Sequence, residues 1–515
     1  MNNIYNGFTF VKALSLNNPT GTSTIRKSLL ENAPEEKPFL HAVVEFRTVY
    51  KTYDGSFGYD WYRKNDNGQS YGGMYKSFIE SGYKDGKTNL KTDEAINRFL
   101  DMYEEISINL SSRKSQKERE EKNYQVPYLS MFSKETVEAM KLPKDLVQPQ
   151  FSITLSAIVE IARNSILKFE YDTTLFDITP QILADKSADR GIHHSKTKEI
   201  TIICKKDLDS NKEIKIYAYP QDRKYKRSLA GKITVLQNNE KVRKNVNFAL
   251  VNIETNIKNV PSPNANTGKI ESAEIDFLRK AMYQCLVVPH ILYDEKTPFD
   301  LTLDNNFKII KNSFGNDQYG KYIFHKTIPT VKWTDGGIFH SYTYSDCHDY
   351  VKKLYISENK KFLKSIFYKN SKEAVDEQYL TDNIFTVFAF REDSFQTYRS
   401  SYFLDNHAVE GEVKNIGENT AMLFNSLNST KRVNDTSLAH EVLHGLGIYH
   451  THIDENPIPT SKILCTFEEK STDNYMSYRA VDPDGTVKGG ERETLWRWQW
   501  KIANKNIPEI ESDPK

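Results

Sequence analysis

Between residues 151 and 255 the chain repeats short apolar or alternating segments separated by turn residues, and this pattern restricts the fold more than any other. Six segments follow one another: 151–162, 166–178, 199–206, 213–220, 231–237 and 246–255. Alternation with a period of two is typical of strands, and strands at this spacing predict a β-sandwich-like module. We place that module at residues 149–258.

A chain of 515 residues is too long for one hydrophobic core, so we expect further modules around this one. Residues 1–38 are polar and irregular, whereas 39–125 predict a mixed β/α module with a helix over 92–106. The charged run 111–122 is typical of a solvated linker or an exposed helix. Residues 265–515 predict an α+β domain. The expected fold is therefore multidomain, with β-rich N-terminal modules followed by an α+β domain.

Within the α+β domain the pattern alternates between apolar runs and helical periodicity. Helices are predicted at 271–286, 345–355 and 490–505. Strands are predicted at 286–294, at 383–390 and, as an edge, at 420–426.

Charge and hydropathy limit the partners of the chain. Lys and Arg number 70 and Asp and Glu 69, so the bulk charge favours neither nucleic acid nor an anionic membrane. The longest apolar runs are too short for a membrane span, which we therefore do not expect. The first residues lack the pattern of a secretory signal peptide. We expect either export without a cleavable N-terminal signal peptide or a cytoplasmic location.

The stretch "LAHEVLHGLGIYHTH" holds four of the twelve histidines of the chain. On a helix that begins at Asp435 or Thr436, His440 and His444 lie one turn apart on the same face and can bind one ion. Glu441 is next to His440, from where it can reach a water molecule on that ion without being a ligand. A general base needs this placement.

A catalytic zinc site has three protein ligands and one open position. His450 is six residues beyond His444, which is about 600° around a continuing helix and therefore on the wrong side. Gly447 can adopt a positive φ, end the helix and return His450 to the ion. We expect His452 to be a supporting or surface residue rather than a ligand.

These residues resemble the metzincin zinc metallopeptidases, whose pattern is HExxHxxGxxH followed by a methionine-containing turn below the metal. The stretch "HEVLHGLGIYH" matches every fixed position, and "DNYMSY" places Met476 26 residues beyond His450. The resemblance covers about residues 265–515 as a domain, with its specific motifs between 440 and 478. Thr451 stands where the astacin-like and serralysin-like groups usually carry Glu or Pro, which leaves the subfamily open.

The resemblance implies a metzincin-like domain that hydrolyses peptide bonds in protein or peptide substrates with Zn²⁺ as cofactor. Its three zinc ligands would be His440, His444 and His450. Glu441 would activate the water, Met476 would form the hydrophobic base of the site, and Tyr478 would bind the zinc or steady the transition state.

Two other functions fit the same motif, namely a zinc peptidase acting on peptidoglycan cross-links and a non-catalytic binding protein that retains the zinc fold. Residues 45–63 resemble the amino-terminal modules of bacterial exported effectors. An exported bacterial effector or toxin would use its N-terminal modules to dock a component of the secretion apparatus.

Overall fold

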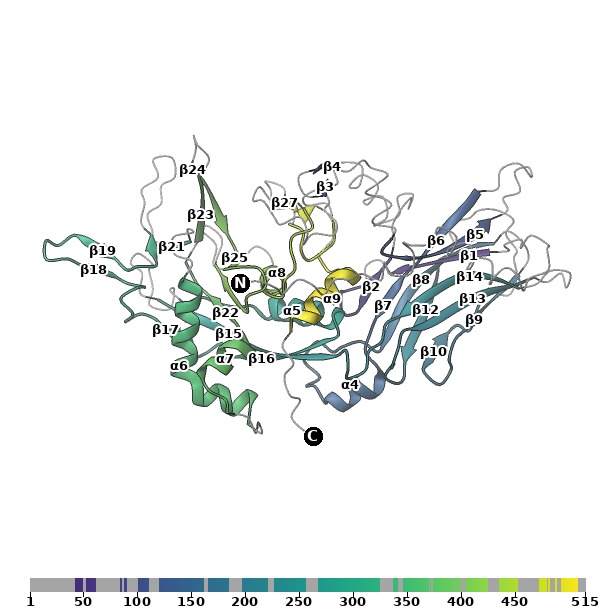
Figure 1. Cartoon of the computed structure of the whole chain (residues 1–515), viewed down its shortest axis with the longest axis horizontal. Helices are drawn as coiled ribbons and strands as arrows, with labels where there is room; N and C mark the ends of the chain where they lie inside the picture. Colours follow the sequence, from purple (N-terminus) through teal and green to yellow (C-terminus); the bar gives the residue numbers. More distant parts are fainter. Residues whose placement is uncertain are drawn as a thin grey trace, which may run out of the picture.

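The computed structural model is a mixed α/β protein with several sheets and, among the described residues, six helices (Figure 1). The described residues are 42–49, 52–61, 84–85, 88–89, 101–110, 120–161, 165–184, 197–220, 227–255, 267–324, 337–340, 346–369, 371, 374–392, 394–399, 404–424, 435–452, 472–478, 480–481, 487–488 and 492–507. The helices are α4 (Lys134–Met140), α5 (Ser272–Gln284), α6 (Cys347–Phe367), α7 (Glu377–Asn383), α8 (Ser437–Gly445) and α9 (Arg497–Asn506). The N-terminal segment 1–38 lies outside the described residues.

Two sheets form a β-sandwich in the N-terminal half (Figure 1, right). The first has the order β1 (Ala42–Thr48), β8 (Ser152–Ile161), β12 (Thr197–Cys204) and β10 (Phe176–Thr179). The second has the order β11 (Ile182–Ala184), β9 (Ser165–Glu170), β13 (Lys212–Pro220), β14 (Ser228–Val235), β7 (Tyr128–Ser130) and β2 (Gly58–Asp60).

One hydrophobic core fills the space between these two sheets. On β8 the alternate residues Ile153, Leu155 and Ala157 are buried, and on β13 of the other sheet Ile214 and Ile216 meet them in the same cluster. Period-two alternation buries one face of each strand, which is why the pattern in the sequence predicted a sandwich.

A third large sheet is mostly parallel and forms the centre of the C-terminal half (Figure 1). Its order is β16 (Val287–Tyr293), β15 (Lys244–Glu254), β22 (Ile384–Ala389), β26 (Thr420–Leu423) and β25 (Gly411–Val413), with β17 (Phe299–Asp300) also paired to β15. The strand β25 is antiparallel to β26 and forms one edge of this sheet.

Helices cover both faces of the parallel sheet. Phe248 and Leu250 of β15 pack in one cluster with residues of α5 and α8, whereas Ala249 and Val251 pack in another with residues of α6 and α7. Parallel sheets are typically buried in this way on both sides, and their strands then consist of continuous apolar runs.

The assignment of β15 to the sandwich-like module was wrong. This strand continues the sequence pattern of the sandwich, but it pairs in parallel with β16 and β22. Two strands of the expected mixed module, β1 and β2, instead belong to the two sheets of the sandwich. A buried parallel strand and a sandwich strand are both short apolar runs, so local sequence does not separate them.

Three further predictions of local structure need correction. The end of the expected helix 92–106 forms β5 (Glu104–Leu110), which pairs with β6 (Glu120–Val126), so part of the expected linker 111–122 is also strand. The residues of 92–106 before 101 lie outside the described residues. The expected edge strand β26 lies between β22 and β25. The closing helix begins only at Arg497, because Thr494 forms a bridge with Asn474.

Several further sheets are separate from the sandwich and from the parallel sheet. They are β3 (Lys84–Asp85) with β4 (Thr88–Asn89), β18 (Ile309–Lys311) with β19 (Asp317–Tyr319), β27 (Ala480–Val481) with β28 (Val487–Lys488), and the four-stranded sheet β20 (Ile323–Phe324), β21 (Gly337–His340), β23 (Ser394–Arg399) and β24 (Leu404–Val409).

Gln284 at the end of α5 joins the two halves of the molecule. Its amide nitrogen donates to the carbonyl oxygens of Gly55 and Glu493 at 2.8 and 2.7 Å, and its amide oxygen accepts from Leu495 N at 2.8 Å. Ser130 of β7 donates to its backbone carbonyl at 2.8 Å. Both the N–H groups and the oxygen of this buried amide have hydrogen-bond partners. These bonds therefore hold the segment before α9 in a fixed position relative to the sandwich.

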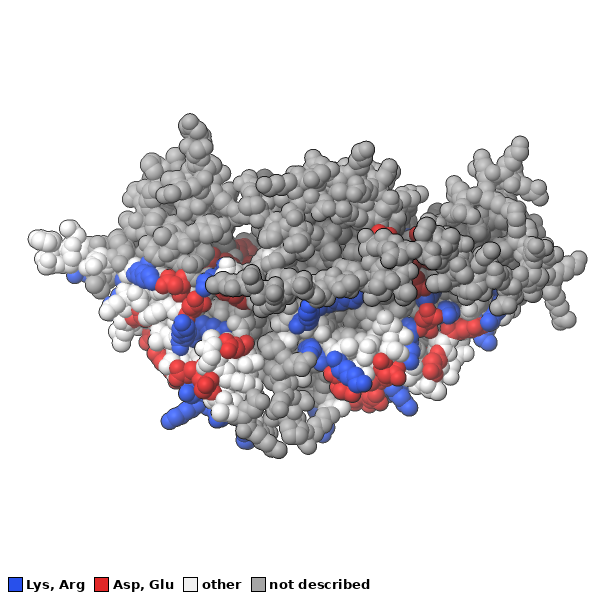
Figure 2. All heavy atoms as spheres, viewed as in Figure 1, with Lys and Arg blue, Asp and Glu red and all other residues white. Residues whose placement is uncertain are grey.

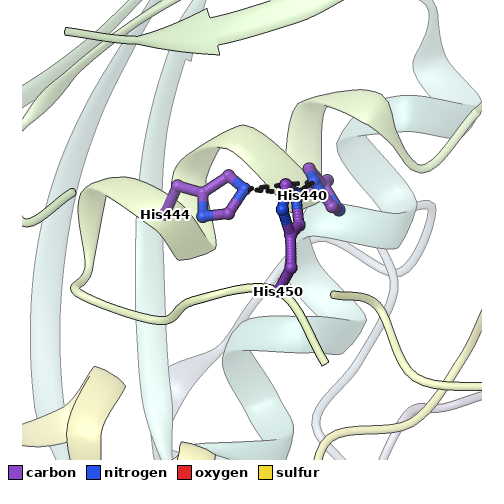
Figure 3. Close-up of side chains that lie close together, drawn as sticks. All are labelled: His440, His444 and His450. Atoms are coloured by element: carbon purple, nitrogen blue, oxygen red, sulfur yellow. Dashed lines mark hydrogen bonds between the residues drawn. The ribbon is translucent and has the colours of Figure 1, made fainter. Parts of the chain in front are cut away.

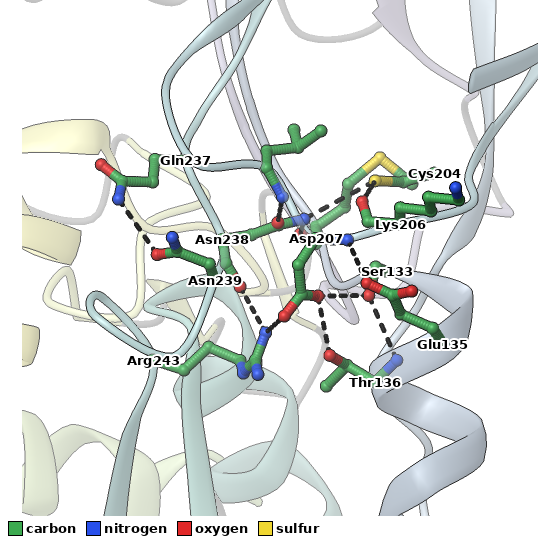
Figure 4. Close-up of polar contacts among 12 residues, drawn as sticks. Ser133, Glu135, Thr136, Cys204, Lys206, Asp207, Gln237, Asn238, Asn239 and Arg243 are labelled. Atoms are coloured by element: carbon green, nitrogen blue, oxygen red, sulfur yellow. Dashed lines mark hydrogen bonds and ion pairs between the residues drawn. The ribbon is translucent and has the colours of Figure 1, made fainter. Parts of the chain in front are cut away.

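A second set of polar contacts, here called the Asp207 network, fixes the passage from the sandwich to β15 (Figure 4). The Asp207 carboxylate accepts from Ser133 Oγ, from Thr136 Oγ1 at 2.7 Å and from Arg243 Nη1 at 2.5 Å. Arg243 also donates to the carbonyl of Asn238 at 2.6 Å. The network therefore connects the first turn of α4 with the residues that lead into β15.

Acidic and basic side chains are interspersed over the described part of the face in Figure 2. Among the described residues, no helix is long and apolar enough to cross a membrane. The described cysteines, Cys204, Cys285 and Cys347, are free and buried.

Candidate metal centre

The helix α8 carries the first two histidines of the motif. Its apolar residues Leu438, Val442 and Leu443 are fully buried and pack in the cluster between α5 and the parallel sheet. Because one face of the helix is held by this packing, His440 and His444 project together from the next face, one turn apart. Of the two expected candidates, Thr436 is the N-cap residue, although its side chain makes no capping hydrogen bond.

The end of α8 returns the chain toward the histidines. Ile448 N donates to the carbonyl of Leu443 at 3.0 Å, and Gly447 N donates to that of His444 at 2.9 Å. Together with φ = +90° at Gly447, these two bonds form a Schellman motif. The predicted helix end at this glycine is therefore confirmed, and His450 follows the turn directly.

The same turn is closed from outside by α9. Asn506 Nδ2 donates to the carbonyl of Leu446 at 2.8 Å, and a Cβ atom at Gly447 would lie only 2.3 Å from that nitrogen. The backbone conformation at Gly447 favours glycine, and a side chain there would also displace the Asn506 amide.

The three histidines meet at their Nε2 atoms (Figure 3). The Nε2 atom of His450 lies 2.9 Å from those of His440 and His444, which are 3.2 Å from each other. A tetrahedral zinc with Zn–N bonds of about 2.0–2.1 Å has N···N edges of about 3.3–3.4 Å. The three nitrogens therefore fit around one metal ion with little movement.

Backbone carbonyls determine which ring nitrogen faces the centre. His440 Nδ1 lies 2.7 Å from the carbonyl oxygen of Tyr475, and His444 Nδ1 lies 2.7 Å from that of Ile448. A carbonyl can only accept, so each Nδ1 carries the proton and each Nε2 presents a lone pair. Burial lowers the pKa of His440 well below its usual value, and the nearby His444 and His450 lower it further. The site thus presents converging acceptors, which a cation satisfies.

Glu441 directly follows His440 on α8 and lies in a confined position. Its side chain is only 8% exposed, and a Cβ atom at Gly411 of β25 would lie 2.5 Å from its Cγ atom. Burial raises the pKa of Glu441 to about 8, an effect that Arg492 opposes and Glu410 increases. Burial therefore strengthens the affinity of Glu441 for a proton, and any residue larger than glycine at position 411 would collide with its side chain.

Met476 lies in a turn that is tied to the chain just after the third histidine. It is fully buried, and its carbonyl accepts from Thr451 N at 3.0 Å and from Thr451 Oγ1 at 3.4 Å. Its own N–H donates to Asn474 Oδ1 at 3.0 Å. Thr451, the departure from the subfamily patterns, therefore fixes the segment of His450 against the methionine turn.

The methionine turn, residues 473–477, is bonded to α9 through a pair of buried side-chain amides. Asn474 Nδ2 donates to Gln499 Oε1 at 2.7 Å, and Gln499 Nε2 donates back to Asn474 Oδ1 at 3.0 Å. Gln499 Oε1 also accepts from Trp496 N at 2.8 Å. The start of α9 and the methionine turn are thereby held as one unit.

Two aromatic rings lie against His450. The His452 ring is stacked on it, with ring centroids 4.8 Å apart and planes 15° apart, and the Tyr478 centroid is also 4.8 Å away. Tyr478 is 39% exposed, whereas His452 is 2% exposed. Of the two expected roles of His452, supporting or surface residue, its burial against the ring of His450 favours the first.

The structure brings every predicted site residue into one region, although their chemical roles stay predictions. Sequence reasoning missed Gly411 and Arg492. Neither stands in a motif, and both are recognised only through contacts with residues far away in the chain.

No protein-family model matches the chain, and no curated protein matches it in sequence. The site is therefore interpreted from its own geometry.

Proposed function

We propose that this chain is a zinc-dependent endopeptidase of the metzincin type that hydrolyses peptide bonds in protein substrates. The single observation that carries the proposal is the convergence of three histidine Nε2 atoms, two of them from the helix that also carries the buried Glu441. The Schellman turn at Gly447 and the methionine turn at Met476 support the likeness to metzincins.

The donor set favours zinc over other common ions. Three imidazoles with one open side are the arrangement that zinc enzymes use for hydrolysis, and hard cations such as Mg²⁺ and Ca²⁺ prefer oxygen ligands. When bound, zinc would polarise the substrate carbonyl and lower the pKa of a water molecule.

The residues of the chain would carry the proton and hold the geometry. Glu441 would accept a proton from the attacking water and deliver it to the nitrogen of the leaving amine. Tyr478, the exposed ring beside His440 and His450, would donate a hydrogen bond to the oxygen on which negative charge develops. The backbone bonds to Nδ1 of His440 and His444 would keep both ligands in place during the reaction.

The edge strand β25 would bind an extended peptide next to these groups. It pairs with β26 on one side, and its Gly411 touches the Glu441 side chain. A peptide added to a sheet edge is held mainly by main-chain hydrogen bonds, which suits an enzyme that cleaves the main chain.

Metal content and proteolysis, measured together on the wild type and on Glu441→Gln, test the proposal. The wild type should contain one zinc per chain and cleave casein. Glu441→Gln should keep the zinc and lose about 10²–10⁴-fold in kcat, because the proton acceptor is removed while the ligands remain.

Glu392→Gln is a matched control. Glu392 is also a buried carboxyl, but it accepts a hydrogen bond from Thr255 Oγ1 and lies on neither α8, β25 nor the methionine turn. This variant should keep its activity. Zinc with cleavage of cell-wall cross-links alone would favour a peptidoglycan substrate, and zinc with cleavage of neither would favour a binding protein.

A further inference from the structure

Tyr478 is the most exposed of the residues that surround the three histidines. Its side chain is 39% exposed, whereas His440, His444 and Met476 are buried. Burial on its own therefore does not hold the ring at 4.8 Å from His450 and 6.0 Å from His440. The position of the ring depends on how the backbone leading to it is held.

Arg492 holds that backbone. It is only 4% exposed, and its Nη1 atom donates to the carbonyl oxygen of Ser477 at 2.6 Å. This carbonyl belongs to the peptide bond that joins Ser477 to Tyr478, so the bond fixes the plane from which the Tyr478 side chain leaves. A charge-assisted bond to a buried carbonyl is stronger than a neutral one.

The residues that follow Arg492 hold the other end of the same turn. Glu493 N and Thr494 N both donate to the carbonyl of Asp473, at 2.9 and 3.1 Å, and Tyr475 N donates back to Thr494 O at 3.0 Å. The methionine turn is thus clamped at its first residue by backbone bonds and at its last by the Arg492 side chain.

We infer that Arg492 is a positioning residue that holds Tyr478 over the metal centre through the Ser477–Tyr478 peptide. The inference rests on the proposed function, because Tyr478 contributes to a reaction only if the site hydrolyses its substrate. Arg492 acts here through Tyr478 and not by contact with the substrate.

The charge of Arg492 offers a competing explanation. It opposes the rise in the pKa of Glu441, so a loss of activity in an Arg492 variant could also come from the general base. The two explanations differ in whether the effect of Arg492 requires Tyr478.

A double-mutant cycle with Arg492→Met and Tyr478→Phe separates them. In the wild-type background Arg492→Met should lower kcat by about tenfold with KM changed less than about twofold, because the lost contact is made in the transition state. In the Tyr478→Phe background the same change should lower kcat by less than about twofold. If Arg492→Met lowered kcat by the same factor in both backgrounds, its effect would not depend on Tyr478 and the inference would be overturned.

Arg492→Lys adds a second discrimination, because it keeps a positive charge on a shorter stem that loses the bond to Ser477. It should behave like Arg492→Met. Full recovery of kcat in Arg492→Lys would mean that charge matters and position does not, which contradicts the inference.

A measurement on the metal-free protein tests the positioning without any reaction. With 3-fluorotyrosine at position 478, the ¹⁹F resonance should be sharp and shifted from the random-coil value. In Arg492→Met it should move toward that value, and an unchanged resonance would overturn the inference. If the wild type binds zinc but cleaves nothing, the proposed function fails while this measurement still decides the role of Arg492.

Arg279→Met is the matched control for loss of a buried arginine. Arg279 of α5 is 6% exposed, and its Nη1 atom donates to the carbonyl of Pro289 on β16 at 3.5 Å. This variant should leave the Tyr478 resonance and kcat unchanged. A shift of the resonance in Arg279→Met would mean that any buried arginine has the same effect, which would also overturn the inference.

Discussion

The Asp207 network and the three-histidine site are both polar clusters with little exposure to solvent, yet they are built in opposite ways (Figures 3 and 4). In the first, hydroxyl and guanidinium donors surround one carboxylate acceptor. In the second, three ring nitrogens face one another, and those of His440 and His444 present lone pairs. Donors that meet acceptors complete a structure, whereas acceptors that meet acceptors prepare a place for a cation.

The pKa shifts in the two clusters have different origins. Burial acts to raise the pKa of Asp207, but hydrogen bonds from Ser133, Arg243 and Thr136 outweigh it, and the pKa is lowered. At His440, burial and the neighbouring histidines act in the same direction and lower the pKa well below its usual value. One group is charged and satisfied by the protein; the other is kept neutral and ready to bind a metal.

The largest expected effect is the loss of one ligand. His444→Ala should abolish hydrolysis and also the rise in Tm that zinc gives the wild type. That rise corresponds to about 4 kcal/mol of stabilisation when zinc is at 1,000 times its Kd. The control is His290→Ala, whose ring bonds Asn245 at 3.1 Å outside the site and should keep the full zinc effect. A zinc-induced rise that survives in His444→Ala would contradict the assignment of this ligand.

Removal of the Asp207 carboxylate should lower the free energy of unfolding and leave the activity of the three-histidine site unchanged. Asp207→Ala leaves Arg243, Ser133 and Thr136 facing no carboxylate and should cost about 2–3 kcal/mol in urea unfolding, with zinc content and kcat unchanged. For comparison, Asp177→Ala removes a carboxylate that is 58% exposed and should cost less than about 0.5 kcal/mol. A change in zinc content in Asp207→Ala would mean that the two clusters are coupled.

The turn that places the third ligand should be the most sensitive single backbone position of the site. Gly447→Ala forces a side chain into a positive φ and against Asn506, at a cost of about 1–2 kcal/mol, and should weaken zinc binding about tenfold. Gly315→Ala has the same backbone strain, with φ = +78° and no neighbouring atom within 4 Å of the added Cβ. It should leave zinc affinity unchanged, so equal losses in both variants would refute the argument.

The smallest effect is a pH dependence of stability. The folded pKa of Asp207 is below its ordinary value of 3.8, so its contribution is complete above that pH and is lost as pH falls through the folded pKa. The difference in unfolding free energy between wild type and Asp207→Asn should therefore be constant near neutral pH and shrink below about pH 4. A difference that grows on acidification would show that the sign of the shift is wrong.

Sequence alone located the three-histidine site because its key geometry is local. The spacing of His440 and His444 is one helical turn, and Gly447 is the residue whose backbone can end that turn. The strand pattern of the sandwich was also readable, since alternation reports one buried face. The zinc ion, the peptidase activity and the likeness to metzincins stay predictions that the experiments above address.

The wrong predictions from the sequence, and the residues it missed, have a common cause: they depend on contacts between distant parts of the chain. The strand β15 belongs to the parallel sheet because β16 and β22 pair with it, and its own residues do not specify those partners. The start of α9 is delayed because Thr494 pairs with Asn474 and Tyr475 in the methionine turn.

The sequence by itself determined which residues could hold a metal, because helical spacing and the conformational freedom of glycine are properties of a few neighbouring residues. Only the tertiary structure decided what surrounds them: Gly411 beside Glu441, His452 against His450, and Arg492 at the end of the methionine turn. Such neighbours depend on the packing of a whole core, and no short stretch of sequence carries that information.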